Sequence, residues 1–274
     1  MDVPCDRLVR EALECCISRM GLATGNTASR FREPALCDTS AMRRRLHSLL
    51  LLVAITGLLG APVNAAPVVV ELFTAQGCSS CPPADALLAE IAKKPGVVAL
   101  AYHVDYWDEL GWKDRFSMPE ATQRQRGYVR KLSKSGAFTP QVVVSGDTSF
   151  IGSDRASMNR ALAQDRDALA ISLSKIGANL QIHLTEPWRE PMDVYVVAYL
   201  GEATTKIGRG ENANRSLREV NIVRSFRRLA KWNGTPQQLT VPLASLARDA
   251  TGVAVLLQRP GQGAVTGAAT LSLR

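Results

Sequence analysis

Cysteine is scarce in most of this chain. Four of its six cysteines lie before residue 42, so the 209 residues from Ala66 to the end contain just Cys78 and Cys81. Small proteins of oxidising compartments commonly carry several structural disulfides. Two cysteines exclude a framework of that kind, and the pair is left as a candidate reactive centre.

The sequence also lacks an apolar run long enough to span a membrane. Its longest candidate, residues 49–59, is shorter than the roughly 20 residues that a spanning helix needs. Basic residues precede it from Met42, and small residues follow it up to Ala65. This order is typical of a secretory signal peptide at 42–65. We predict cleavage after Ala65, export to the periplasm or beyond, and no stable membrane span afterwards.

Residues 1–41 precede this signal and have no apolar periodicity that predicts a core. We interpret them as an over-called start or a disordered extension, with Met42 as the true initiator. The alternative is a cytoplasmic extension ahead of an uncleaved anchor. The arginines before the apolar run keep that end inside, so residues after about 66 face outward in either case.

The exported part has neither a strong net charge nor a basic stretch interleaved with aromatic residues. It has 25 Lys and Arg against 19 Asp and Glu, and its densest basic stretch, 215–231, includes acidic and apolar residues. Such a stretch favours a solvated face over a nucleic-acid surface. We find no repeat or low-complexity tract either. These absences predict a soluble, folded protein with no nucleic-acid partner.

Apolar patterns in the first half of the exported part predict an α/β unit. Continuous apolar runs at 67–73 and 97–104 predict buried strands, and helical spacing over 87–92 lies between them. Strand, helix and strand in this order imply parallel pairing. The other expected elements are a helical stretch in 119–135, a strand at 141–144, a turn at 146–147, a return strand at 150–151 and a closing helix that is capped by Ser153 and Asp154 and ends near 163.

Beyond about residue 168 the pattern changes to short alternating segments that predict antiparallel strands. These segments are 180–184, 194–200, 239–241, 253–257 and 265–273. We therefore predict two domains: an α/β domain of the order βαβ…ββα at 66–166, and a smaller, all-β, sandwich-like domain at 167–274.

The cysteine pair lies at the expected start of the helix, with Ser79 and Ser80 between the two thiols. Free N–H groups and a partial positive charge at a helix N-terminus stabilise a thiolate. We predict Cys78 as the nucleophile and Cys81 as the thiol that resolves a mixed disulfide. The small serines leave the first sulfur accessible. This chemistry requires no metal ion or other cofactor.

Other roles for the pair stay open. Zinc needs four ligands, and the exported part adds just His103 and His183 to the two cysteines. A structural disulfide gains little stability from closing so short a loop. The pair also suits a redox-sensing binding module, or a periplasmic copper chaperone that uses both thiols and His103.

Several motifs around the pair match those of a known family. They are residues 71–85, 102–107, 111–116, 139–141 and 152–155, together with 210–212. In these segments the chain resembles a bacterial and plant family of secreted thioredoxin-like proteins that is known only as a domain of unknown function. The resemblance implies a thioredoxin-like fold for 66–166 and names no substrate.

Two further residues are implied by a comparison with thioredoxins in general. Pro140 stands where thioredoxins have a cis-proline that faces the disulfide, so we predict a cis Thr139–Pro140 bond near Cys78. Glu71 stands close to the sequence position where thioredoxins carry a buried acid that moves protons for the second cysteine. The spacing from Glu71 to Cys78 is one residue longer than in thioredoxins. The two interpretations of Glu71 are a general base and an ordinary, paired strand carboxylate.

Three side chains follow the second expected strand at its carboxyl end, the edge where α/β sheets place their sites. They are His103, Asp105 and Trp107, and they are predicted to line a substrate groove with Thr139, Ser79 and Ser80. The alternative for the three is a strand-end turn packed by aromatics. We expect protein thiols and disulfides of the periplasm as partners. A membrane-bound electron donor is a further expected partner if the pair acts as a reductant, since its potential depends on the stability of the thiolate.

Overall fold

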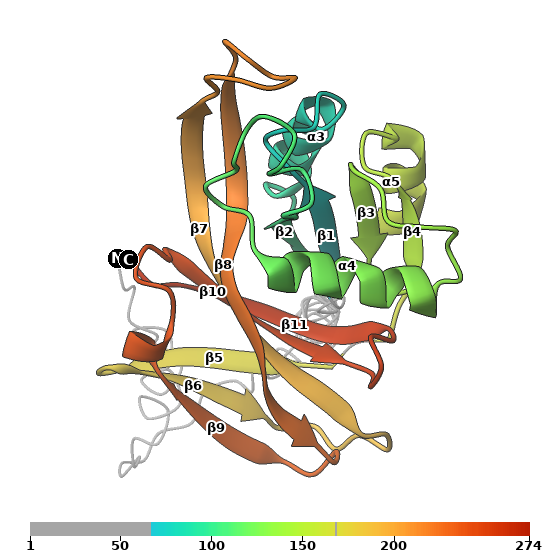
Figure 1. Ribbon diagram of the computed structural model, residues 1–274. Helices are drawn as coiled ribbons and strands as arrows, with labels where there is room; N and C mark the ends of the chain where they lie inside the picture. The colour runs from blue at the N-terminus through green and yellow to red at the C-terminus, as the bar shows by residue number, and fades with distance from the viewer. Residues whose placement is uncertain (1–66, 168) are drawn as a thin grey trace, which may run out of the picture. The chain divides into compact units, whose positions relative to one another are not determined.

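The structure, a computed structural model, describes residues 67–167 and 169–274. The predicted signal peptide and residues 1–41 lie outside this range. No helix within the described ranges is long and apolar enough to cross a membrane. Figure 1 shows a large sheet with helices on it and a second, small sheet. The fold is therefore mixed α/β, as the sequence predicts, and the large sheet dominates it.

The first half of the described chain contains four strands and three helices. They are β1 (Val68–Thr74), α3 (Pro82–Ile91), β2 (Val97–His103), α4 (Pro119–Lys131), β3 (Gln141–Val144), β4 (Thr148–Ile151) and α5 (Arg155–Leu162). Strand β1 pairs with β2 in parallel and with β3 in antiparallel, and β4 pairs with β3. The predicted βαβ unit and the predicted hairpin are both present.

Helix α3 begins where the sequence predicts it. Pro82 and Pro83 occupy its first turn, where a missing N–H costs no hydrogen bond. Leu88 and Ile91 are buried and pack with Leu72 of β1. This packing fixes the start of α3, and with it the cysteines, at the carboxyl end of β1.

Helix α4 belongs to a different core cluster from α3. Its Ala121 and Tyr128 pack with Phe73 and Tyr102, two rings that stack with centroids 5.5 Å apart. Helix α5 is capped by Asp154, whose carboxylate accepts the Ser157 N–H, as the sequence predicts.

The second half consists mainly of strands. They are β5 (Ile171–Ile176), β6 (Asn179–Leu184), β7 (Met192–Lys206), β8 (Ser216–Trp232), β9 (Gln237–Pro242), β10 (Gly252–Gln258) and β11 (Val265–Ser272), with a short 3-10 helix at Leu243–Ser245. The eight-stranded sheet has the order β11-β10-β7-β8-β2-β1-β3-β4, and the small sheet has the order β5-β6-β9. A second apolar cluster joins the two sheets through β6, β7 and β10.

The interpretation of the basic stretch 215–231 as a solvated face needs correction, because most of this stretch forms strand β8 of the large sheet. Arg227 and Arg228 are exposed, as expected, but Ile222 and Val223 are buried in the sheet. Ile222 pairs in parallel with Ala101 of β2, while β8 pairs along its length with β7 in antiparallel. Strands from both halves thus share one sheet. The division into two domains near 166 stays a prediction.

Candidate functional site

Cys78 and Cys81 form a disulfide at the start of α3, with their Cα atoms 5.4 Å apart. Cys81 is the N-cap of α3, and its carbonyl oxygen accepts the N–H groups of Ala84 and Asp85. Both cysteines are 0% exposed, whereas Ser79 is exposed. In this disulfide form the expectation of an accessible Cys78 sulfur is wrong, because another part of the chain covers it.

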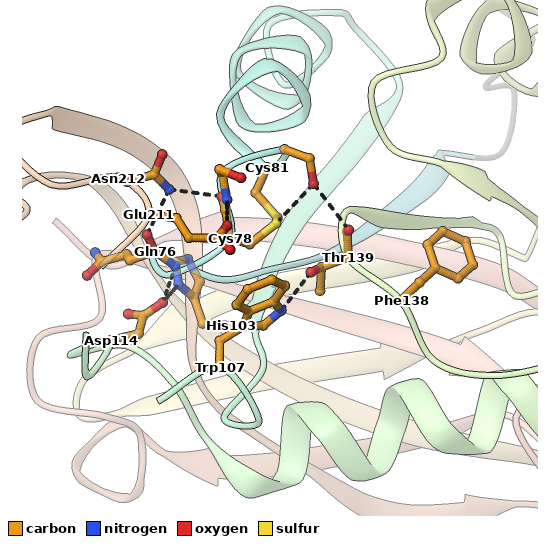
Figure 2. The surroundings of a disulfide bond; sticks show 12 residues. Gln76, Cys78, Cys81, His103, Trp107, Asp114, Phe138, Thr139, Glu211 and Asn212 are labelled. Carbon is orange, nitrogen blue, oxygen red and sulfur yellow. Dashed lines mark hydrogen bonds and ion pairs between the residues drawn. A yellow bond between two sulfur atoms is a disulfide. The ribbon is translucent and has the colours of Figure 1, made fainter. Parts of the chain in front are cut away.

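Ser80, Thr139 and Trp107 meet beside the disulfide (Figure 2). The Ser80 hydroxyl lies 3.3 Å from Cys78 Sγ and donates to the Thr139 carbonyl oxygen at 3.5 Å. Trp107 Nε1 donates to Thr139 Oγ1 at 2.8 Å. The Thr139–Pro140 bond is cis, which confirms that prediction. Residues from three separate segments therefore form one wall of the site.

The opposite wall comes from the connection between β7 and β8, residues 207–215, which we call the 207–215 loop. Asn212 Nδ2 donates to the carbonyl oxygens of Gln76 and Cys78, each at 2.9 Å, and Arg215 holds the Asn212 side-chain oxygen at 3.0 Å. Glu211 Oε2 accepts the Ser79 N–H at 3.0 Å. The contacts of Asn212 and Glu211, shown in Figure 2, hold the loop against the cysteine turn, where Cys78 is buried.

A buried polar cluster lies next to Gln76. His103 Nδ1 is 2.6 Å from Asp114 Oδ2, and its Nε2 is 3.8 Å from Glu219 Oε1. The Gln76 N–H donates to Asp114 Oδ2 at 2.8 Å, and the Gln76 side chain donates to Glu219 Oε2 at 2.8 Å. Asp85, one turn beyond Cys81, interacts with His103 electrostatically from α3. His103 is therefore an element of this cluster and is 0% exposed, so it does not line an open groove.

Burial and charge shift the pKa values of this cluster in opposite directions. Burial lowers the pKa of His103, but the negative charges of Asp114 and Glu219 outweigh it and raise the pKa to about 9. Burial raises the pKa of Asp85 to about 7. The His103 charge overcomes burial at Asp114 and lowers the pKa of that carboxyl. His103 is thus protonated at neutral pH.

These shifts predict how the stability of the oxidised protein depends on pH. The folded state holds the His103 proton up to about pH 9, whereas an unfolded histidine loses it near 6.5. The stability from His103 is complete below 6.5 and is lost as pH rises through 9, by about 3 kcal/mol. Asp85 lowers stability between about pH 4 and 7, so the loss from His103 is measured from pH 7 to 9.

Denaturant unfolding at fixed pH values measures this loss. In the Asp85→Asn background the free energy of unfolding should fall between pH 7 and 9, and this decline should be much smaller when His103→Gln is added. The background is needed because loss of the His103 charge raises the pKa of Asp85 into the same window. Equal slopes in the two proteins, or a flat profile in the Asp85→Asn protein, would contradict the charge assignment at His103.

Glu71 is paired away from the cysteines. It is buried, and its two oxygens accept hydrogen bonds from Arg124 Nε at 2.6 Å and Nη2 at 3.1 Å. Tyr128 donates to the same carboxylate, and Gln258 accepts from Arg124 Nη2 at 3.1 Å. This pairing favours the interpretation of Glu71 as a satisfied strand carboxylate over a general base.

Asp105 also has a local partner. Its carboxylate accepts the Thr122 hydroxyl at 2.5 Å, while the Asp105 N–H donates to the same hydroxyl oxygen at 3.1 Å. The two residues therefore tie the turn after β2 to the first turns of α4. Of the three residues predicted to line the groove from this turn, Trp107 is the one that reaches Thr139.

Several residues of the site were not predicted from the sequence. They are Gln76, Asp85, Asp114, Glu211, Asn212 and Glu219. All of them except Glu219 lie within motifs of the family resemblance but had no role assigned to them. Glu219 offered a weaker signal, as the one acidic residue of β8. None of the described residues forms a group of three or more His, Cys, Asp or Glu side chains suited to a metal ion.

The fold and the site define a mixed α/β protein with a two-cysteine disulfide at a helix start. The chain belongs to the family described as a protein of unknown function (DUF1223), whose model matches residues 69–258. No curated protein matches it.

The solved structures similar to the chain include two named proteins. One is protein AGR_C_4864 from Agrobacterium tumefaciens, with 33% identity and a TM-score of 0.68 over 77% of this chain and 96% of that one. The other is HBP35 of Porphyromonas gingivalis, with 14% identity and a TM-score of 0.53 over 76% of each chain. The second likeness concerns the fold alone.

Proposed function

We propose that this protein is an exported thiol–disulfide oxidoreductase that exchanges protein disulfides through Cys78 and Cys81. The observation that carries the proposal is the disulfide at the N-terminus of α3, with Thr139 and cis-Pro140 beside it. A thiolate formed there gains from the positive end of the α3 helix dipole. Export rests on the predicted signal peptide at 42–65.

A thioredoxin-like domain is part of this proposal. The strand order β2-β1-β3-β4, with β1 and β2 parallel and β3 and β4 antiparallel, supports it. So does the position of the pair directly after β1 and before α3. In this arrangement β7, β8, β10 and β11 extend the sheet of that domain beyond β2.

The proposed reaction moves two electrons. In the reduced protein the Cys78 thiolate attacks one sulfur of a substrate disulfide; the other sulfur leaves as a thiolate and takes a proton. Cys81 then loses its proton and attacks Cys78 Sγ, which forms the Cys78–Cys81 disulfide and releases the second substrate thiol. The substrate disulfide is reduced and the protein dithiol is oxidised. The reverse sequence oxidises a substrate dithiol.

Turnover of a protein disulfide tests the proposal. Reduction of insulin by dithiothreitol should be faster with the full chain than without it, and the double variant Cys78→Ser/Cys81→Ser should lose this acceleration. Because four more cysteines precede residue 42, the double variant is the matched control for their contribution. Equal rates with both proteins would contradict the proposal.

The 207–215 loop should slow access to the disulfide. Asn212→Ala removes two hydrogen bonds that hold the loop on Gln76 and Cys78, each worth on the order of 1 kcal/mol. We expect dithiothreitol to reduce the Cys78–Cys81 bond about three to ten times faster in this variant. Mass spectrometry of the alkylated peptide that carries both cysteines gives the rate.

Asn221→Ala is the control, because Asn221 also donates from its side chain to a backbone carbonyl, that of Ala99 in β2. It reports the effect of a general loss of stability. Equal acceleration in both variants would contradict a specific covering role for the loop.

A further inference from the structure

Few backbone donors remain available at the start of α3. Pro82 and Pro83 have no N–H, and the N–H groups of Cys81 and Ala84 donate to the carbonyl oxygens of Cys78 and Cys81. The Ser79 N–H directly follows Cys78 in the chain. In the structure it donates to the carboxylate of Glu211, 3.0 Å away, and not to a sulfur atom.

Glu211 reaches this position from the other half of the chain. It is exposed, whereas its neighbour Asn212 is buried and anchored on Gln76 and Cys78. Gly210 adopts a φ of +78°, and a Cβ added there would meet Trp112 Cβ at 3.2 Å. Asn212 therefore anchors the loop on the segment around Cys78. As a result, the Glu211 carboxylate lies at the Ser79 N–H, one residue from the proposed nucleophile.

We infer that Glu211 sets the reduction potential of the Cys78–Cys81 pair by opposing the Cys78 thiolate and occupying the Ser79 N–H. This inference rests on the proposed function, since it treats the pair as redox-active. Reduction by a dithiol breaks the Cys78–Cys81 bond, puts two electrons on the sulfurs and leaves a Cys78 thiolate beside the carboxylate. The carboxylate makes that product less favourable, so the pair becomes a weaker oxidant.

Other charged groups lie on the elements that surround the pair. Asp85 lies on α3, His103 on β2, Asp114 on the connection to α4 and Glu219 on β8. These four are buried, and His103 offsets the charges of the acids through its contacts with Asp114 and Glu219. Glu211 and Arg215 of the 207–215 loop are both exposed, but Arg215 donates to Asn212, whereas Glu211 contacts the cysteine turn itself through the Ser79 N–H. Hydrogen bonds from Ser79 lower the pKa of Glu211, which keeps it ionised at neutral pH.

Glu211→Gln separates charge from contact, since the amide oxygen can still accept the Ser79 N–H. At pH 7 its equilibrium with dithiothreitol should shift towards the protein dithiol by about three- to tenfold, which corresponds to a potential about 15 to 30 mV more positive. In the Cys81→Ser background the pKa of Cys78 should fall by about half a unit to one unit. Glu211→Lys should shift both quantities further in the same direction.

Glu202→Gln is the matched control. Glu202 is an exposed acid of β7, paired with Arg218 of β8, and its removal changes the net charge equally. The full chain is used, and the peptide with both cysteines is quantified by mass spectrometry. An unchanged potential in Glu211→Gln, or an equal shift in Glu202→Gln, overturns the inference. If insulin turnover is absent while the Glu211 shift is present, the proposed function fails and the inference about the potential survives.

Discussion

Cys81→Ser should accumulate mixed disulfides through Cys78, whereas Cys78→Ser should accumulate none. Cys78 precedes the helix, and its sulfur lies 3.3 Å from Ser80 Oγ on the side of Thr139. Cys81 is the N-cap of α3 and lies within the turn. A variant that lacks the resolving thiol therefore attacks a substrate disulfide but cannot release it. Trapped adducts are separated without reductant, and mass spectrometry locates the bond.

The two serine variants control for each other, because each keeps one cysteine of the pair and all the cysteines before residue 42. If Cys78→Ser forms adducts through Cys81 and Cys81→Ser forms none through Cys78, the assigned roles are reversed. If neither variant traps a protein in the periplasm, a redox-sensing module becomes the better explanation.

Glu71→Leu should destabilise the protein by about 3 to 5 kcal/mol, because it leaves the Arg124 charge buried without its partner. The guanidinium of Arg124 also lies 5.1 Å from the Tyr128 ring centroid, among other aromatic rings. The double variant Glu71→Leu/Arg124→Met replaces both charges by apolar groups and should recover most of the lost stability. Denaturant unfolding of the three proteins gives the difference.

The same variants distinguish a structural role of Glu71 from a catalytic one. Since Glu71 of β1 is paired with Arg124 of α4 and not with a cysteine, the folded double variant should keep its rate of disulfide exchange at all pH values. A lower rate with an altered pH profile would make Glu71 the proton acceptor for Cys81, contrary to the geometry described above.

The elements that local patterns encode were predictable. Apolar runs predict β1 and β2, the two prolines predict the start of α3, and the cysteine pair falls between them. The cis bond at Thr139–Pro140 was predicted through the resemblance. Each of these signals occupies a few consecutive residues, so one sequence is enough to show it.

The packing of the 207–215 loop against the cysteine turn was not predictable in this way. Asn212 and Glu211 reach Cys78 and Ser79 across more than 130 residues, and no local pattern reports such a contact. Strand β8 was missed because basic residues interrupt its apolar residues, so neither a continuous apolar run nor a regular alternation marks it. As a result, the sequence predicts an accessible Cys78 sulfur, whereas tertiary packing buries it.

The reduction potential of the Cys78–Cys81 pair distinguishes an exchange centre from a structural disulfide. It is measured by equilibrating the full chain with a thiol–disulfide buffer and quantifying the alkylated peptide that carries both cysteines. Exchange proteins have potentials between about −120 and −270 mV, whereas structural disulfides of secreted proteins are typically below about −300 mV. We predict a value in the first range for this pair. A value below about −300 mV would mark the bond as structural and contradict the proposed oxidoreductase.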